Sequence, residues 1–170
     1  RVIRDVNADV IATVEVDGRI ALQRFNTQSL PFVSGTPYPH VMVIDGNDDR
    51  GIDVGLMSRF PVGTMRSHVD DADNGTRIFS RDCPEYQIVL PSGGRLLLLV
   101  NHLKSKASGT QEDSSAKRLR QAERVREIYD ARRQTGLTHV VVLGDFNDTP
   151  DSAPLAPLLG NNSNLRDIFT

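Results

Sequence analysis

The residues with the clearest chemical potential are Asp145 and Asn147, which follow the apolar run at residues 139–143. In an extended chain, residues two positions apart lie on the same side, so this carboxylate and this amide would converge. The pair suits a phosphoryl group, because the carboxylate can orient a water or take its proton while the amide binds an oxygen without adding charge. Taken alone, the segment fits equally well a turn capped by Asp145 with Asn147 beginning a helix, since both residue types favour turns.

Two more polar side chains stand at the ends of apolar runs. His102 follows residues 95–100 and precedes Lys104 and Lys106. A histidine there could act as an acid or face a phosphate as a cation, although a single histidine after a strand is more often structural. Glu15 ends the run at residues 10–14 and offers the oxygen ligand that magnesium prefers. Three such runs ending in polar residues together indicate a metal-dependent phosphoester site.

The order and separation of these segments resemble the endonuclease/exonuclease/phosphatase superfamily, which has the deoxyribonuclease I-like fold. The resemblance spans almost the whole chain and rests on residues 9–15 (DVIATVE), 50–61 (RGIDVGLMSRFP), 101–105 (NHLKS) and 144–147 (GDFN). Residues 79–83 (FSRDC) look like a bacterial branch of the superfamily. No single segment is decisive, but four in the family's order are a specific signal.

The resemblance implies a role for each matching position. Glu15 would bind the catalytic Mg²⁺, for which Mn²⁺ could substitute. His102 would contact the scissile phosphate, Asp145 would orient or deprotonate the attacking water, and Asn147 would help to hold water and phosphate. The substrate-side positions that it suggests are Arg50, Asp53 and Asn101.

The chain departs from the family pattern at both ends and at Val14. The family usually begins with a strand that bears a metal-supporting Asn and ends with an Asp-His pair, and neither is found within residues 1–170. Val14 stands where a Gln commonly precedes the metal-binding Glu. We therefore expect residues 1–170 to be one domain of this superfamily, incomplete at both ends, that could be inactive by itself.

The expected activity is metal-dependent hydrolysis of phosphodiester bonds, with a nuclease-like enzyme and a nucleic acid substrate favoured. Two alternatives stay open: a phosphoesterase acting on lipid or inositol phosphates, such as a sphingomyelinase-like member, and a non-catalytic binding module on the same fold. Residues 101–134 carry a local excess of positive charge that could steer a nucleic acid, but a solvated helix face is the simpler interpretation. No sequence feature identifies a protein partner.

Composition sets limits on these interpretations. The 170 residues, 38% of them hydrophobic, suffice for one domain with a sizeable core. A net charge of −2 gives no overall attraction to polyanions, and the single Cys83 excludes an intramolecular disulfide framework. The longest apolar run, residues 96–100, falls far short of the roughly 20 residues that span a bilayer.

Periodicity and turn residues predict a layered α/β sandwich of the α+β type, with largely antiparallel mixed sheets. We expect strands at residues 10–14, 40–44, 52–57 and 139–143, and a hairpin made of 86–90 and 95–100. We expect helices at residues 2–10, from 115 to near 136 with Asp113 capping, and after Pro150. Residues 26–40 and 67–75 are predicted to be loops. His40, His68 and His139 have no companion acids at ligand spacing and are interpreted as incidental.

Overall fold

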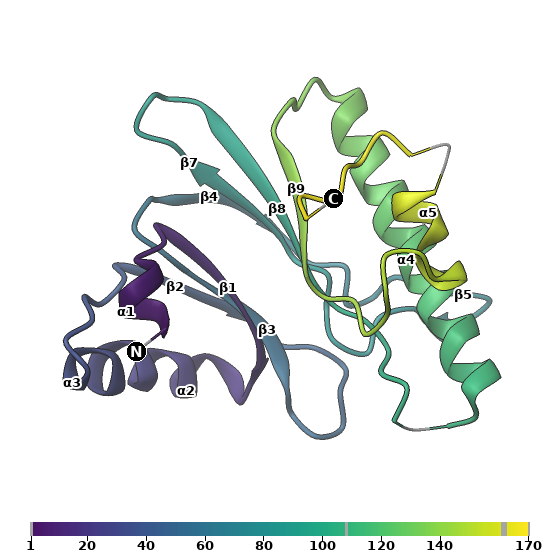
Figure 1. The fold of residues 1–170 in the computed structure, drawn as a ribbon, viewed down its shortest axis with the longest axis horizontal. Coiled ribbons are helices and arrows are strands. Elements are labelled where there is room, and N and C mark those ends of the chain that lie inside the picture. Colours follow the sequence, from purple (N-terminus) through teal and green to yellow (C-terminus); the bar gives the residue numbers. More distant parts are fainter. Residues whose placement is uncertain (1, 108, 161–162, 170) are drawn as a thin grey trace.

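Two β-sheets form the centre of the computed structural model, which describes residues 2–107, 109–160 and 163–169 (Figure 1). The first sheet is antiparallel and has the order β1 (Val10–Val16), β3 (Asp53–Ser58), β2 (His40–Ile44). The second has the order β4 (Val62–Arg66), β7 (Glu85–Val89), β8 (Arg95–His102), β9 (Val140–Asp145). Only its β8–β9 pair is parallel. Strands β5 (Ala72–Asp73) and β6 (Thr76–Arg77) form a separate small hairpin.

The helices lie outside the two sheets. They are α1 (Val2–Val6), α2 (Gly18–Arg24), a π-helical segment (Phe25–Ser29), α3 (Leu30–Phe32), the long α4 (Gln111–Gln134), a 3₁₀ turn (Ala153–Leu155) and α5 (Ala156–Leu159). Because α4 follows β8 and precedes β9, it is the crossover that allows these two strands to run parallel.

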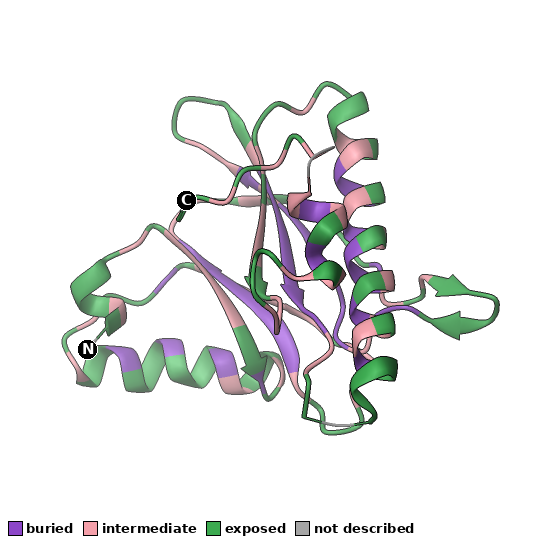
Figure 2. Cartoon of the chain, turned by 45° about the vertical axis from the view of Figure 1, so that its right-hand side comes forward, coloured by how far each residue is buried: buried purple, intermediate pink, exposed green. Residues whose placement is uncertain are grey.

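Strand β8 shows why the chain forms layers. Successive side chains of a strand point to opposite faces. Leu97 and Leu99 accordingly join the cluster beneath α4 and α5, whereas Leu98 and Val100 pack against residues of β3 and β7 between the sheets. Figure 2 shows the central strands buried and only one face of α4 covered. Alternate side chains of this one strand therefore belong to two different hydrophobic cores.

The first sheet is covered on its other face by the helical segment that follows β1. Leu22 and Leu30 pack there with Met57 of β3 and Val41 of β2. The order of layers is therefore helix, sheet, sheet, helix. This arrangement confirms the predicted α/β sandwich with mostly antiparallel pairing.

The prediction of a loop across residues 26–40 was wrong for its first part. The helical segment continues through α3 to Phe32, and the irregular chain begins only after it. Two contacts explain the difference: Leu30 is buried against the sheet, and the Asn26 side chain both donates to and accepts from the backbone of Tyr38. Tertiary contacts outweighed the local turn signals of Pro31 and its neighbours, and Pro31 is tolerated at the start of α3.

Other helices and strands also differ from the predicted boundaries. Helix α4 begins at Gln111 instead of residue 115, and its N-cap is Thr110, whose hydroxyl accepts from the amide of Asp113. Asp113 itself therefore lies in the first turn. Strand β4 was not predicted, the polar stretch at 67–75 contributes to the β5–β6 hairpin, and α1 ends at Val6.

In the parts of the chain that the structure describes, none of the helices combines the length and the apolar character that crossing a bilayer requires.

Candidate active site

Strands β8 and β9 end side by side at two of the predicted site residues. They pair in parallel with His102 opposite Asp145, and each is the last residue of its strand. Parallel neighbours present their carboxyl ends at the same edge of a sheet. The tertiary structure thus brings together side chains that are 43 positions apart, with His102 Nε2 at 3.9 Å from Asp145 Oδ2. That separation is too long for a direct hydrogen bond.

Gly144 permits this close pairing. Its φ is +129°, and a Cβ added there would lie 1.9 Å from the carbonyl oxygen of Asn101. Any other residue would have to push β9 away from β8 just before Asp145. The glycine of the GDFN segment is therefore required by the backbone geometry of the site.

His102 is buried, and its ring forms no close hydrogen bond with the described residues. The residue is 4% exposed, and its Nδ1 atom has no hydrogen-bonding partner among the described residues. Burial lowers the pKa of His102 below its ordinary value of 6.5, and the charge of Arg81 acts in the same direction. Asp145 and Glu15 oppose the shift. The ring is therefore neutral at pH 7, and a neutral imidazole can still donate one hydrogen bond.

The Asp145 and Asn147 segment forms the turn that the sequence allowed, but Asn147 does not begin a helix, because the next helical element starts at Ala153. Asp145 Oδ1 accepts a hydrogen bond of 2.8 Å from the amide of Asn147, whose φ is +53°. This is the expected turn capped by an aspartate. The other oxygen, Oδ2, faces His102, and the Asp145 side chain is half exposed. One carboxylate oxygen fixes the turn while the other stays available for chemistry.

Asn147 also ties the two strand ends to each other. Its Nδ2 donates to the carbonyl oxygen of Leu103 at 3.1 Å, and the amide of Leu103 donates to the carbonyl of Asp145. These contacts set the position of Asn147 close behind the pair formed by His102 and Asp145.

Glu15 lies at an irregularity of β1. The register of β1 against β3 shifts between Thr13 and Val16, and Glu15 takes a left-handed φ of +56°. Such a bulge re-aims a side chain out of the regular alternation. The residue is exposed, and its carboxylate accepts no hydrogen bond from the described residues. Its charge acts on both His102 and Arg50, which places it in the same electrostatic neighbourhood.

The three predicted substrate-side residues differ in accessibility. Arg50 is largely exposed and pairs with Asp48, and its hydrogen bond holds the pKa of that carboxyl well below the usual range. Asp53 is buried, and its Oδ1 accepts from the amide of Gly46 at 2.7 Å, so it stabilises a turn. Asn101 is also buried, its Nδ2 donates to the carbonyl of Leu99, and its Oδ1 has no partner among the residues that the structure describes. Of the three, only Arg50 presents its side chain to solvent, and contact with substrate stays a prediction for each.

Arg81 was not among the predicted site residues, but it lies beside the site in the structure. It is buried, donates from Nη2 to the carbonyl of Leu103 at 2.7 Å and pairs through Nη1 with Asp48 at 3.1 Å. Burial lowers the pKa of Arg81, while Asp48 opposes the shift. The signal that could have found it was its place in the FSRDC segment, which was noted only as part of the family resemblance.

The side chains near the candidate site suit a metal ion that prefers oxygen ligands and keeps most of its water molecules. The described residues contain no group of three or more His, Cys, Asp or Glu side chains placed to hold a metal ion. A four-ligand protein site of the zinc type is thus not formed by them. Mg²⁺ usually takes one or two protein carboxylates and fills its other positions with water and substrate phosphate. The free carboxylate of Glu15 matches that requirement, and Mn²⁺ has similar ligand preferences.

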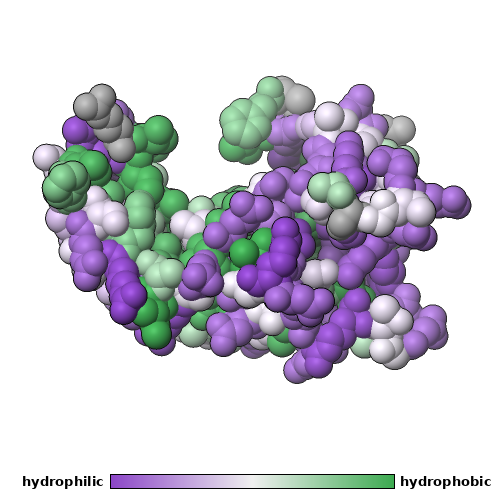
Figure 3. All heavy atoms as spheres, turned by 90° about the horizontal axis from the view of Figure 1, so that it is seen from below, coloured by the Kyte–Doolittle hydropathy of each residue, from purple (hydrophilic) through white to green (hydrophobic). Residues whose placement is uncertain are grey.

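An apolar cavity in the described residues does not coincide with these polar groups. It is an open groove of about 480 Å³ between β9 and the segment at residues 164–169, and its lining is mainly apolar. Glu15 and His102 do not line it. In the view from below, hydrophobic atoms are exposed on the walls of a hollow in the molecule (Figure 3). The candidate chemistry therefore lies at the strand ends and not in the apolar groove.

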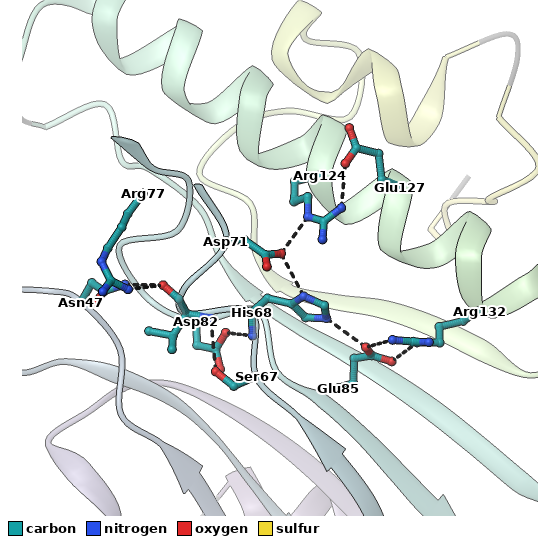
Figure 4. A network of polar contacts seen from close by, with 11 residues as sticks. Asn47, Ser67, His68, Asp71, Arg77, Asp82, Glu85, Arg124, Glu127 and Arg132 are labelled. Carbon is teal, nitrogen blue, oxygen red and sulfur yellow. Dashed lines mark hydrogen bonds and ion pairs between the residues drawn. The ribbon is translucent and has the colours of Figure 1, made fainter. Parts of the chain in front are cut away.

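A second polar cluster surrounds His68 and corrects its interpretation as incidental (Figure 4). Its Nδ1 lies 2.9 Å from Asp71 Oδ2 and its Nε2 lies 2.9 Å from Glu85 Oε1. Glu85 also receives two hydrogen bonds from Arg132, and Asp71 receives one from Arg124. We call these five residues the His68 cluster. Its members come from β7, from α4 and from the segment that precedes β5, so it joins these parts of the fold.

Comparisons with known proteins address the fold and the family of the chain. None of the curated proteins matches the chain. Among solved structures, the human nocturnin catalytic domain with bound sulfate is similar with a TM-score of 0.66 and 14% identity, over 90% of this chain and 56% of that one. Sphingomyelinase C from Streptomyces griseocarneus has a TM-score of 0.61 and 18% identity, over 88% and 55%. A Staphylococcus aureus beta toxin variant with bound magnesium ions has a TM-score of 0.60 and 17% identity, over 88% and 55%.

At these identities the structures show a shared fold, and the chain spans just over half the length of each of them. The sequence provides the more specific result, because the profile of one family matches residues 1–167, nearly the whole chain. The resemblance found in the four segments is thereby confirmed: the chain belongs to the Endonuclease/Exonuclease/phosphatase family.

Proposed function

We propose that this chain forms the greater part of a metal-dependent phosphodiesterase domain that hydrolyses its substrate by attack of water on phosphorus. The observation that carries the proposal is the pair at the ends of β8 and β9. His102 Nε2 and Asp145 Oδ2 face one another across 3.9 Å without bonding each other. Polar side chains that are held in place but lack hydrogen-bonding partners can form those hydrogen bonds with a substrate.

The geometry of each residue supports the role that we assign to it. Asp145, fixed through Oδ1 by the amide of Asn147, can accept the proton of the attacking water at Oδ2. Neutral His102 can donate a hydrogen bond to a phosphate oxygen, where negative charge grows in the transition state. Asn147, held by its contact with Leu103, can bond an oxygen of water or phosphate with its remaining amide atoms.

Glu15 would hold the metal ion. When bound, Mg²⁺ supplies positive charge to the phosphate oxygens and favours ionisation of a bound water. The exposed guanidinium of Arg50 offers a cation to the rest of an anionic substrate.

Nucleic acid is the substrate class that we propose first, because a repeating phosphodiester can use the cation of Arg50 in addition to the reacting pair. The long helix adds little to this argument. Arginines of α4 that looked available for a polyanion in the sequence are paired with acids, as in Arg118 with Asp148, Arg120 with Asp73 and Arg126 with Asp130. The solvated or structural interpretation of that helix is therefore favoured.

The test uses the complete natural protein with bis-p-nitrophenyl phosphate and Mg²⁺. Asp145→Ala and His102→Gln should each lower the rate by about 100-fold or more, because each removes a group positioned at the reacting centre. Asp130→Ala is the matched control, since Asp130 is an acid on α4 that pairs with Arg126 within the helix. Near-normal rates for the first two variants would remove them from the mechanism.

The substrate class is tested with a panel of plasmid DNA, RNA, sphingomyelin and inositol phosphates. Turnover of a nucleic acid above the other substrates is the expected result. Preference for sphingomyelin or an inositol phosphate would move the enzyme to the lipid or sugar branch. Absence of both Mg²⁺ binding and turnover would indicate a non-catalytic module.

A further inference from the structure

A buried arginine of α4, Arg118, lies between the two segments that carry the candidate site. Its side chain is 0% exposed, although it belongs to a helix whose other arginines reach solvent in part. Burying a guanidinium is costly unless hydrogen bonds and an opposite charge compensate for it. The contacts of Arg118 therefore show what this position is used for.

Arg118 contacts both segments at once. Its Nε donates to Asp148 Oδ2 at 2.8 Å, just after Asn147 in the segment that follows β9. Its Nη1 donates at 2.7 Å to the carbonyl oxygen of Lys104, in the segment that follows β8. One planar guanidinium thus bridges the backbone behind His102 and the acid behind Asn147.

Neighbouring contacts make the bridge rigid. Gln121, one turn further along α4, accepts from the amide of Lys104 at 2.8 Å and donates to the carbonyl of Ile78 at 3.0 Å. Asp148 also receives a hydrogen bond of 2.7 Å from Lys106. Burial opposes the charge of Asp148, yet the bonds from Lys106 and Arg118 hold its pKa at about 2. The carboxylate therefore stays ionised at any pH near neutrality.

We propose that Arg118 is a positioning residue, whose guanidinium sets the distance between His102 and the turn of Asp145 and Asn147. It touches neither of the reacting side chains and acts through Asp148 and the carbonyl of Lys104. This inference rests on the function proposed above, since it gives Arg118 a role in that reaction. Misplacement of reacting groups by about 1 Å can cost on the order of 100-fold in rate.

Arg118→Lys tests the bridge, because an ammonium keeps the charge but lacks the planar fork that reaches two separate acceptors. In the complete protein, kcat should fall by about 10-fold to 100-fold with little change in KM. The matched control is Arg132→Lys on the same helix. Arg132 also donates two hydrogen bonds to a buried carboxylate, that of Glu85, but belongs to the His68 cluster. Its kcat should stay within about twofold of the parent value.

A second readout is independent of catalysis. The amides of Lys104 and Thr149 donate to Gln121 and Asp148, so their hydrogen exchange reports on the two bridged segments. Exchange at both should be faster in Arg118→Lys and unchanged in Arg132→Lys. If Arg118→Lys does not fold, Asp148→Asn gives the same test from the other end of the bridge.

The outcomes separate the two proposals. Unchanged exchange in Arg118→Lys overturns the bridge whatever the activity. Faster exchange with an unaltered kcat overturns the positioning role. A parent protein without turnover refutes the proposed function, while the exchange measurements still decide whether Arg118 holds the two segments.

Discussion

Two buried histidines of this chain have opposite surroundings. His68 has a carboxylate at each ring nitrogen, both at 2.9 Å, and each of these acids is paired in turn with an arginine. His102 has an acid 3.9 Å from Nε2, and within the described part of the chain its Nδ1 has no partner. The hydrogen bond to Glu85 and the charge of Asp71 outweigh burial and raise the pKa of His68, whereas burial lowers that of His102.

The difference is the one that we expect between a structural histidine and a histidine with the catalytic role proposed for His102. A histidine whose two nitrogens both contact acids has its hydrogen-bonding positions occupied by the protein itself. One that is buried and incompletely bonded has a hydrogen bond left for a substrate. Burial by itself therefore does not identify a functional histidine, while the balance between burial and bonding partners does.

The largest expected effect on stability comes from breaking the His68 cluster at its centre. Glu85 is 2% exposed, and Glu85→Gln removes the charge that faces both His68 and Arg132. We expect a loss of about 3 kcal/mol in the free energy of unfolding, because two cations lose their shared counter-charge. Urea unfolding would measure it. The rate of the folded fraction should be normal, in contrast to His102→Gln, and a large loss of rate without loss of stability would reverse the assignment of the two regions.

A change of pH is expected to have a smaller effect on the stability of the protein than Glu85→Gln. Because the pKa of His68 is higher in the folded than in the unfolded protein, the cluster contributes fully below the ordinary value of 6.5. That contribution is lost as the pH rises through the folded pKa. Thermal unfolding at a series of pH values should show that the melting temperature declines as the pH rises above 6.5, and His68→Gln should abolish this decline. The same substitution at the exposed His139 serves as the control, and an identical decline in both variants would contradict the prediction.

The smallest effect on stability should come from an exposed ion pair near the His68 cluster. Arg77 pairs with Asp70, but their side chains are 52% and 84% exposed. Arg77→Ala should change the free energy of unfolding by no more than about 0.5 kcal/mol, since solvent screens exposed ion pairs. A loss comparable with that of Glu85→Gln would show that the cluster extends to the surface.

Much of the fold and part of the site could be predicted from local sequence. The alternation of residues 95–100, the helical periodicity within α4 and the polar residues at the strand ends depend on spacings of one to four positions, which the sequence displays directly. The four segments around Glu15, Asp53, His102 and Asp145 together indicated the family, which the profile match confirms.

The rest depended on contacts between distant residues. His68 meets Glu85 across 17 positions, Arg118 meets Asp148 across 30, and Asn26 holds the helical segment by bonding Tyr38. No local pattern encodes such pairs, because they form only when the sheets and α4 pack together. The sequence by itself determined which residue types stand at the strand ends. The tertiary structure decided which of them are satisfied and which remain free, because burial and hydrogen-bonding partners are properties of the packed chain.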